Sequence, residues 1–152
     1  MAKKKPIQKK RVLFICTHNS CRSQMAEALL RHRYGDTYES FSAGTSPSRV
    51  NPWAIRALGE IGVDISGQIS DHIEKYIGEA FDTVVTTCDA AKETCPVFPG
   101  ATRTIHHSFE DPAGAAGSKE KIMEVFRRVR DEIDLWIQEE FGSGSLPAKK
   151  EP

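Results

Sequence analysis

The chain has 152 residues, enough for one domain that buries roughly two-thirds of the surface its unfolded chain would expose. Apolar residues make up 39% and charged residues 28%, as in ordinary globular proteins, and no stretch approaches the roughly 20 apolar residues of a membrane span. Twenty-one basic residues balance 21 acidic ones, which excludes a general nucleic-acid binder. We therefore expect a cytoplasmic protein with no nucleic-acid or membrane partner.

The two ends of the chain have the composition of tails. Residues 1–10 are rich in lysine, and the apolar run 12–16 after them is too short for the roughly 7–15-residue core of a signal peptide. Residues 142–152 are rich in Gly, Ser, Pro and Lys, which is typical of disordered segments. The sequence thus predicts a basic N-terminal tail (1–10), a single catalytic domain (11–141) and a flexible C-terminal tail (142–152).

Strand-like and helix-like patterns alternate along the domain. In chain order they predict a buried strand at 12–15, a helix over 25–34, a strand at 38–43, a helix that starts at Pro52 with Asn51 as its cap, strands at 81–87 and 102–107, and a long amphipathic helix after Ser118. The helix at Pro52 is expected to bury Ile55, Leu58 and Ile61 or Gly62. This order predicts an α/β fold, a three-layer sandwich in which a four-stranded parallel sheet has helices on both faces. In such folds ligands bind at the carboxyl ends of the strands.

The turn after the first strand carries the strongest chemical signal. Residues 16–23 (CTHNSCRS), here called the oxyanion loop, lie between a buried strand and a helix. Such a turn can aim backbone N–H groups, the positive end of the helix and the fork of Arg22 at one anion. The same field stabilises negative charge on sulfur, so we expect Cys16 to be a thiolate at neutral pH and Ser23 to donate a hydrogen bond to it.

A simpler interpretation of this pattern makes Cys16 a buried core thiol and Arg22 a surface residue, because Cys-x5-Arg also arises by chance. The strand before the loop and the helix after it favour the oxyanion site. Within the loop, Cys21 is interpreted as a packing residue. His18 is interpreted as an exposed histidine without a partner, in preference to a metal ligand or an acid–base group.

The segment VLFICTHNSCRSQMAE, from Val12 to Glu27, resembles the signature of low-molecular-weight tyrosine phosphatases and of the arsenate reductases that share their fold. The resemblance implies that Cys16 is the nucleophile and that Asp111, in an Asp-Pro pair, protonates the leaving oxygen. By itself Asp-Pro would indicate a simple turn. The residues that the resemblance implies for substrate binding are Thr17, His18, Asn19, Ser20, Cys21 and Arg22.

Two further cysteines, Cys88 and Cys95, follow the third predicted strand. The segments VVTTCDAAKETCPVFPG, FEDPAG and VRDEI resemble thioredoxin-coupled arsenate reductases, and the likeness runs from about Arg11 to Phe141. It implies that arsenate is reduced to arsenite by a relay through Cys16, Cys88 and Cys95, that thioredoxin reduces the final Cys88–Cys95 disulfide, and that a weak phosphatase activity accompanies the reaction. The residues alone also allow two core thiols, or a zinc site, although zinc-binding cysteine pairs are usually separated by two to four residues.

The seven-residue spacing of Cys88 and Cys95 limits the conformations in which they can pair. If residues 88–95 were helical, their Cα atoms would lie about 10.5 Å apart, whereas a disulfide tolerates at most about 7 Å. Our hypothesis is a helix in the reduced protein that unwinds on oxidation and exposes the disulfide to its reductant.

The resemblance further implies a potassium ion beside the loop, and no other cofactor. The residues that match its ligands are Asn19, Glu27, Ser42 and Asp71. The sequence departs from its relatives at His18, where they often have Gly, and near His107, where they often have an aromatic residue. Adjacent strand residues point to opposite faces, so His106 and His107 are interpreted as ordinary strand residues and not as a metal pair.

Two alternatives to the reductase remain open at this point. The first is a low-molecular-weight protein tyrosine phosphatase, which needs Cys16 but neither of the other two cysteines. The second is a catalytically silent protein that binds oxyanions or senses redox state.

Overall fold

The computed structural model describes residues 8–89 and 98–142. The elements in these ranges are β1 (Lys10–Cys16), α1 (Arg22–Tyr34), β2 (Tyr38–Gly44), α2 (Pro52–Gly59), the 3-10 helix η1 (Ile73–Tyr76), β3 (Phe81–Thr86), β4 (Ala101–His106), the 3-10 helix η2 (Pro112–Gly114) and α4 (Lys119–Phe141). Each predicted strand and helix is present there, with ends shifted by at most three residues. No helix among the described residues is long and apolar enough to cross a membrane.

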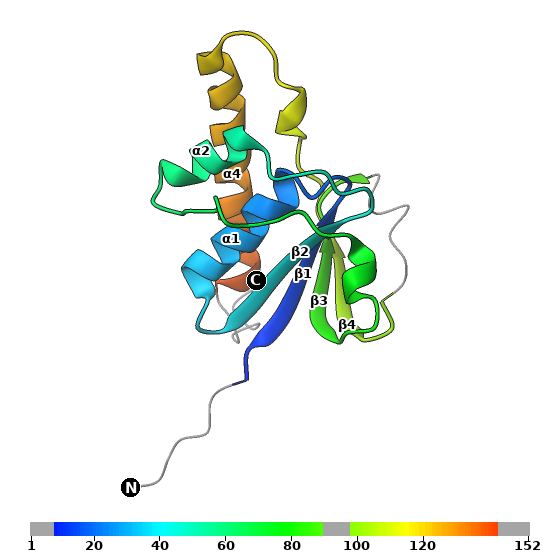
Figure 1. The fold of residues 1–152 in the computed structure, drawn as a ribbon. Helices are drawn as coiled ribbons and strands as arrows, with labels where there is room; N and C mark the ends of the chain where they lie inside the picture. Colours follow the sequence, from blue (N-terminus) through cyan, green and yellow to red (C-terminus); the bar gives the residue numbers. More distant parts are fainter. Residues whose placement is uncertain (1–7, 90–97, 143–152) are drawn as a thin grey trace, which may run out of the picture.

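The four strands form one parallel sheet in the order β2-β1-β3-β4, which confirms the predicted fold class (Figure 1). The register pairs Cys16 with Gly44 and Ile15 with Thr86. Because the strands are parallel, the chain segments that follow β1, β2 and β3 all leave the sheet at the same edge. The oxyanion loop therefore lies beside Gly44 on one side and beside the end of β3 on the other.

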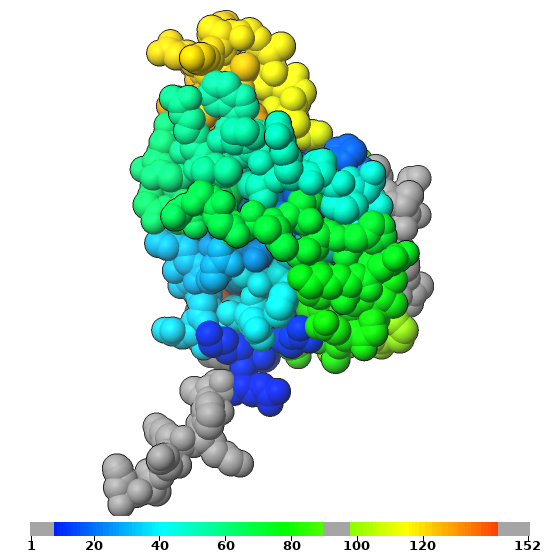
Figure 2. All heavy atoms as spheres, in the orientation of Figure 1, coloured from blue at the N-terminus to red at the C-terminus, as the bar shows by residue number. Residues whose placement is uncertain are grey.

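Strand β1 is buried on both faces, as its continuous apolar run predicts. Val12 and Phe14 belong to the core formed with α1, α2 and α4, whereas Leu13 and Ile15 belong to the core formed with η1 and β3. In the space-filling view the cyan and green residues of the middle of the chain cover most of β1, whose blue atoms show mainly at its start (Figure 2). The two cores fix the end of β1, and with it the start of the loop.

Two helices begin as their caps predict, although α2 ends earlier than expected. Asn51 accepts a hydrogen bond from the backbone N–H of Trp53, and Ser118 accepts one from Lys121, so each caps its helix. The expectation that α2 buries Ile61 is wrong: this side chain is 40% exposed. The helix ends at Gly59, and the chain turns through Gly62 at φ +83°, so Ile61 lies outside the helical face.

Some predictions concern residues outside the described ranges. The redox-switched helix over 88–95 falls almost entirely on residues 90–97, and Cys95 is one of these. Residues 1–7 and 143–152, which hold most of the two predicted tails, also lie outside the described ranges.

Gly44 tests how tightly the sheet edge supports the oxyanion loop. A Cβ at this position would lie 2.6 Å from the Thr17 carbonyl oxygen and 2.9 Å from the Asn19 nitrogen, both backbone atoms. We expect Gly44→Ala to lower the free energy of unfolding by about 1–3 kcal/mol in urea denaturation, as other overpacked sites do. Gly59→Ala is the matched control: its Cβ meets nothing within 4 Å, so the free energy should rise by roughly 0.5–1 kcal/mol. Equal effects of the two substitutions would contradict this account.

Candidate active site

The oxyanion loop is held by a row of backbone hydrogen bonds from the segment after β2. The carbonyl oxygens of Cys16, Thr17, His18 and Ser20 accept hydrogen bonds from the N–H groups of residues 45, 46, 48 and 51 at 2.8–3.3 Å. The C=O and N–H of a trans peptide point in opposite directions, so the N–H groups that follow these carbonyls are directed away from this segment. The loop thus keeps a set of backbone donors available for an anion.

Asn19 gives the loop its shape. Its φ of 49° is left-handed, a conformation that Asn adopts more readily than most residues. The fully buried side chain accepts a hydrogen bond from the Asp71 N–H and donates one to Ser23 Oγ, both at 2.8 Å. Since Ser23 Oγ accepts from Asn19, its own proton is left for Cys16 Sγ, which lies 2.9 Å away. A hydrogen bond donated to this sulfur favours a negative charge on it over the neutral thiol.

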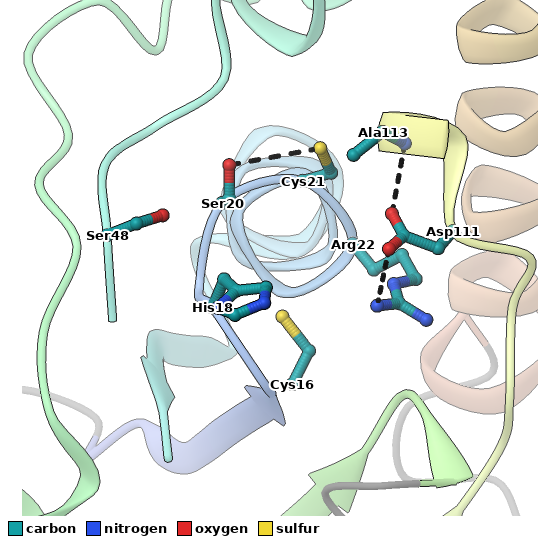
Figure 3. Close-up of a pocket in the computed structure, with 8 residues that line it drawn as sticks. All are labelled: Cys16, His18, Ser20, Cys21, Arg22, Ser48, Asp111 and Ala113. Atoms are coloured by element: carbon teal, nitrogen blue, oxygen red, sulfur yellow. Dashed lines mark hydrogen bonds and ion pairs between the residues drawn. The ribbon is translucent and has the colours of Figure 1, made fainter. Parts of the chain in front are cut away.

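A pocket of about 200 Å³ opens over Cys16 (Figure 3). The residues that line it come from β1, the loop, the segment after β2 and the segment after β4; they are Cys16, His18, Ser20, Cys21, Arg22, Ser48, Asp111 and Ala113. Two of the predicted substrate-binding residues, Thr17 and Asn19, are not among them. The side chain of Asn19 lies beneath the loop, and that of Thr17 contacts Cys88.

Arg22 is oriented by two groups of the segment after β4. It donates a hydrogen bond to the Phe109 carbonyl at 3.2 Å, and a terminal nitrogen lies 3.5 Å from an Asp111 carboxylate oxygen. Its Nε is buried and has no hydrogen-bond partner among the described residues. A buried donor without a partner costs free energy, which an anion bound in the pocket would offset.

Asp111 stands at the rim of the pocket, on the side of Arg22 (Figure 3). Its carboxylate accepts a hydrogen bond from the Ala113 N–H at 3.0 Å and so caps the short helix η2. The side chain is 47% exposed, which allows it to exchange protons with water. The predicted acid and the predicted nucleophile therefore line the same pocket.

The sequence-based interpretation was right for one loop side chain, Cys21, and wrong for another, His18. Burial raises the pKa of the Cys21 thiol to about 12, and this neutral sulfur belongs to the core, as expected of a packing residue. The expectation that His18 has no partner is wrong. Its Nδ1 lies 3.0 Å from the Ser46 carbonyl oxygen, and because a carbonyl only accepts, Nδ1 donates.

Cys88 follows β3 and reaches the loop from the neighbouring strand end. The residue is buried, at 4% exposure, and its Sγ lies 3.4 Å from Thr17 Oγ1. Two of the three predicted redox cysteines are thus brought to one edge of the sheet, while Cys95 lies outside the described residues. Within the described ranges no group of three or more His, Cys, Asp or Glu side chains could hold a metal ion.

The four predicted potassium ligands lie together behind the loop. Ser42 Oγ donates to Glu27 Oε1 at 2.5 Å, and Asn19 is joined to the backbone of Asp71. Burial raises the pKa of Glu27, the Ser42 hydrogen bond opposes the shift, and the nearby charge of Asp71 adds to it. Arg31 and Lys75 lie 3.2 Å and 3.3 Å from the two carboxylates. The ligand atoms that these residues offer are all oxygens, so the set fits a hard cation.

Sequence reasoning missed two residues of the pocket wall, Ser48 and Ala113. Ser48 lies four residues after β2 and Ala113 two residues after Asp111. The one sequence signal for them is that both lie in turns that follow strands, at the sheet edge where the oxyanion loop lies. Neither residue type carries chemistry that would have singled it out.

Comparisons with known proteins agree on a family. The model of the low molecular weight phosphotyrosine protein phosphatases matches residues 11–140. An arsenate reductase of Halalkalibacterium halodurans is 47% identical over 132 residues, which are 87% of this chain and 95% of that protein. A solved arsenate reductase in its phosphate binding state superposes with a TM-score of 0.78 at 34% identity, covering 90% of this chain and 99% of its own. A thioredoxin-dependent arsenate reductase of Corynebacterium glutamicum superposes with a TM-score of 0.61 at 34% identity, covering 86% of this chain and 62% of its own.

Arg22→Lys tests whether the oriented guanidinium binds the substrate oxyanion. A lysine keeps the charge but loses the planar fork and its fixed donors, so we expect kcat/KM for an oxyanion or phosphate-ester substrate to fall by about a hundredfold or more. Arg103→Lys, at an exposed position on β4 paired with Glu140, should leave the rate unchanged. Near-normal kcat/KM in Arg22→Lys would show that the guanidinium does not hold the substrate.

Proposed function

Since the chain belongs to the low-molecular-weight phosphotyrosine protein phosphatase family, we propose that it uses the oxyanion loop of that fold to reduce arsenate to arsenite. The observation that carries this proposal is the contact between Cys88 and Thr17, at 3.4 Å, which brings a second thiol to the loop that holds Cys16. A phosphatase has no use for that thiol, because water completes its reaction. The relatives named arsenate reductase, at up to 47% identity, support the same choice of substrate.

The first step of the proposed reaction forms a covalent adduct. The Cys16 thiolate attacks the arsenic of arsenate, an S–As bond forms, and the departing oxygen takes a proton from Asp111 and leaves as water. The backbone donors of the loop and the Arg22 guanidinium stabilise the negative oxygens as they rearrange. Ser23 holds the sulfur anion before the attack.

The next steps transfer two electrons to arsenic. The Cys88 thiolate attacks Cys16 Sγ, so an S–S bond forms, the S–As bond breaks, and its electron pair stays on arsenic, which leaves as arsenite. The Cys95 thiolate then attacks Cys88 and releases Cys16 as a thiolate. A thioredoxin dithiol reduces the Cys88–Cys95 disulfide and is itself oxidised, as the dependence named for the Corynebacterium glutamicum relative suggests.

The pocket wall also favours an inorganic oxyanion over a phosphotyrosine side chain. None of the eight described residues that line it is Phe, Tyr or Trp, and most are small or polar. The phenyl ring of phosphotyrosine would find no Phe, Tyr or Trp side chain to stack on among these residues. Because adduct formation resembles the first step of phosphate-ester hydrolysis, we expect a weak phosphatase activity that depends on Cys16 and not on Cys88.

A potassium ion is the second part of the proposal. Asn19, Glu27, Ser42 and Asp71 would hold it, and its charge would add to those of Arg31 and Lys75 in offsetting the repulsion between the two carboxylates. Asn19 belongs to both the loop and this cluster, so an ordered cluster would also fix the loop.

Cys95→Ser separates the proposed reductase from the alternatives. With thioredoxin, thioredoxin reductase and NADPH, the wild type should turn over arsenate repeatedly. The variant should form one arsenite per enzyme and accumulate a Cys16–Cys88 disulfide, measured by peptide mass mapping. Hydrolysis of p-nitrophenyl phosphate by the variant should match the wild type and serves as the control for folding. Repeated turnover by Cys95→Ser would refute the relay, and a wild type that binds arsenate but yields no arsenite would point to a silent binding protein.

The potassium proposal predicts a cation-specific effect on stability. Because burial raises the pKa of Glu27, its ionised form destabilises the fold, and this loss of stability grows as pH rises through the folded-state pKa. At pH 8, replacing choline chloride with potassium chloride at equal ionic strength should raise the melting temperature by about 2–4 °C, or roughly 1 kcal/mol. Glu27→Gln should lose this response. Glu74→Gln, which removes an exposed acid from η1, should retain it, and an equal response in all three proteins would contradict the site.

A further inference from the structure

The imidazole of His106 joins the residues on both sides of Cys88. His106 Nε2 lies 2.9 Å from Asp89 Oδ1, one residue after the cysteine, and Nδ1 lies 2.7 Å from Thr86 Oγ1, two residues before it. Thr86 is also the partner of His106 in the register of β3 and β4. One ring on the edge strand thus holds the chain at two points that flank the second thiol.

The chemistry of the partners shows which roles the two ring nitrogens take. The Asp89 carboxylate only accepts hydrogen bonds, so Nε2 carries a proton and donates it, while Nδ1 shares a hydrogen bond with the Thr86 hydroxyl, a group that can either donate or accept. With both nitrogens engaged, the ring cannot rotate without losing a hydrogen bond. Thr86 is buried at 4% exposure, whereas the Asp89 side chain is 82% exposed. The imidazole therefore ties an otherwise solvated residue to the rigid end of the sheet.

We propose that His106 is a positioning residue that holds Cys88 against the oxyanion loop for its attack on Cys16. This inference rests on the proposed function. In that step the S–S bond forms as the S–As bond breaks and arsenic takes its electron pair, so the rate depends on how well Cys88 Sγ is aligned with Cys16 Sγ. The ring acts through Thr86 and Asp89. It makes no contact with the substrate pocket, whose lining residues do not include it.

The test measures disulfide formation in a background that stops after one turnover. In Cys95→Ser protein, His106→Ala should slow the formation of the Cys16–Cys88 disulfide after arsenate addition by about tenfold or more, because the thiol loses its alignment. Hydrolysis of p-nitrophenyl phosphate, which needs Cys16 but not Cys88, should stay within about twofold of the parent, the range of an ordinary surface change. His32→Ala, which removes an exposed histidine of α1, is the matched control and should change neither rate.

A second pair of variants shows whether the effect passes through Asp89. Asp89→Ala alters an exposed side chain and should slow disulfide formation like His106→Ala, while the double variant should be no slower than either single one. His106→Gln, whose amide can still donate to Asp89, should recover part of the rate. In the single variants, Cys88 should also react faster with iodoacetamide, since its segment is less firmly held.

Three results would overturn the inference while the relay itself stands. These are an unchanged rate of disulfide formation in His106→Ala, an equal fall in phosphate-ester hydrolysis, or additive effects of the two substitutions. A parent protein that forms no Cys16–Cys88 disulfide would instead refute the proposed function, and the positioning role with it.

Discussion

The side chain of Asn19 is the contact on which the rest of the site depends. Its amide nitrogen donates a hydrogen bond to Ser23 Oγ, so the serine proton remains available for Cys16. Its amide oxygen accepts a hydrogen bond from the backbone of Asp71, a residue of the oxygen cluster behind the loop. The same residue has the left-handed backbone that turns the loop back toward α1. The shape of the loop, the hydrogen bond to Cys16 Sγ and the carboxylate cluster are therefore coupled through a single buried residue.

The parallel sheet determines which chemistry the loop can perform. Cys16 ends β1 between the ends of β2 and β3, so the residues directly after β3 are among those that a neighbouring strand brings close to it. A thiol there is within reach of the loop, and Cys88 occupies that place. The same loop without a thiol at this position would suit hydrolysis, because water would then be the second nucleophile. In the proposed reaction, the step that separates reduction from hydrolysis thus depends on Cys88, a side chain outside the loop.

Sequence reasoning predicted well what depends on neighbours along the chain. The apolar run of β1, the cap at Asn51 and the strand–loop–helix order around Cys16 are local patterns, and the structure shows each of them. What it missed were mainly contacts between distant segments. The carbonyl partner of His18 comes from residue 46, and no pattern near His18 indicates it.

For the same reason the sequence did not reveal the side-chain partners of His106, although it correctly placed this residue on a strand. Its two partners lie 17 and 20 residues away, and they meet it only through the register of β3 and β4. The misplacement of Ile61 has a different cause. The helical period predicts a buried face as long as the helix continues, but it does not predict that the helix ends at Gly59.

The neutral thiol of Cys21 has a consequence for product inhibition in the proposed reaction. Trivalent arsenic is a soft centre that binds thiolates, and two thiolates facing one pocket would chelate it. Cys16 and Cys21 line the same pocket, but a sulfur with a pKa of about 12 stays protonated at neutral pH. At Cys21, released arsenite therefore meets a protonated thiol, which attacks trivalent arsenic more slowly than a thiolate would.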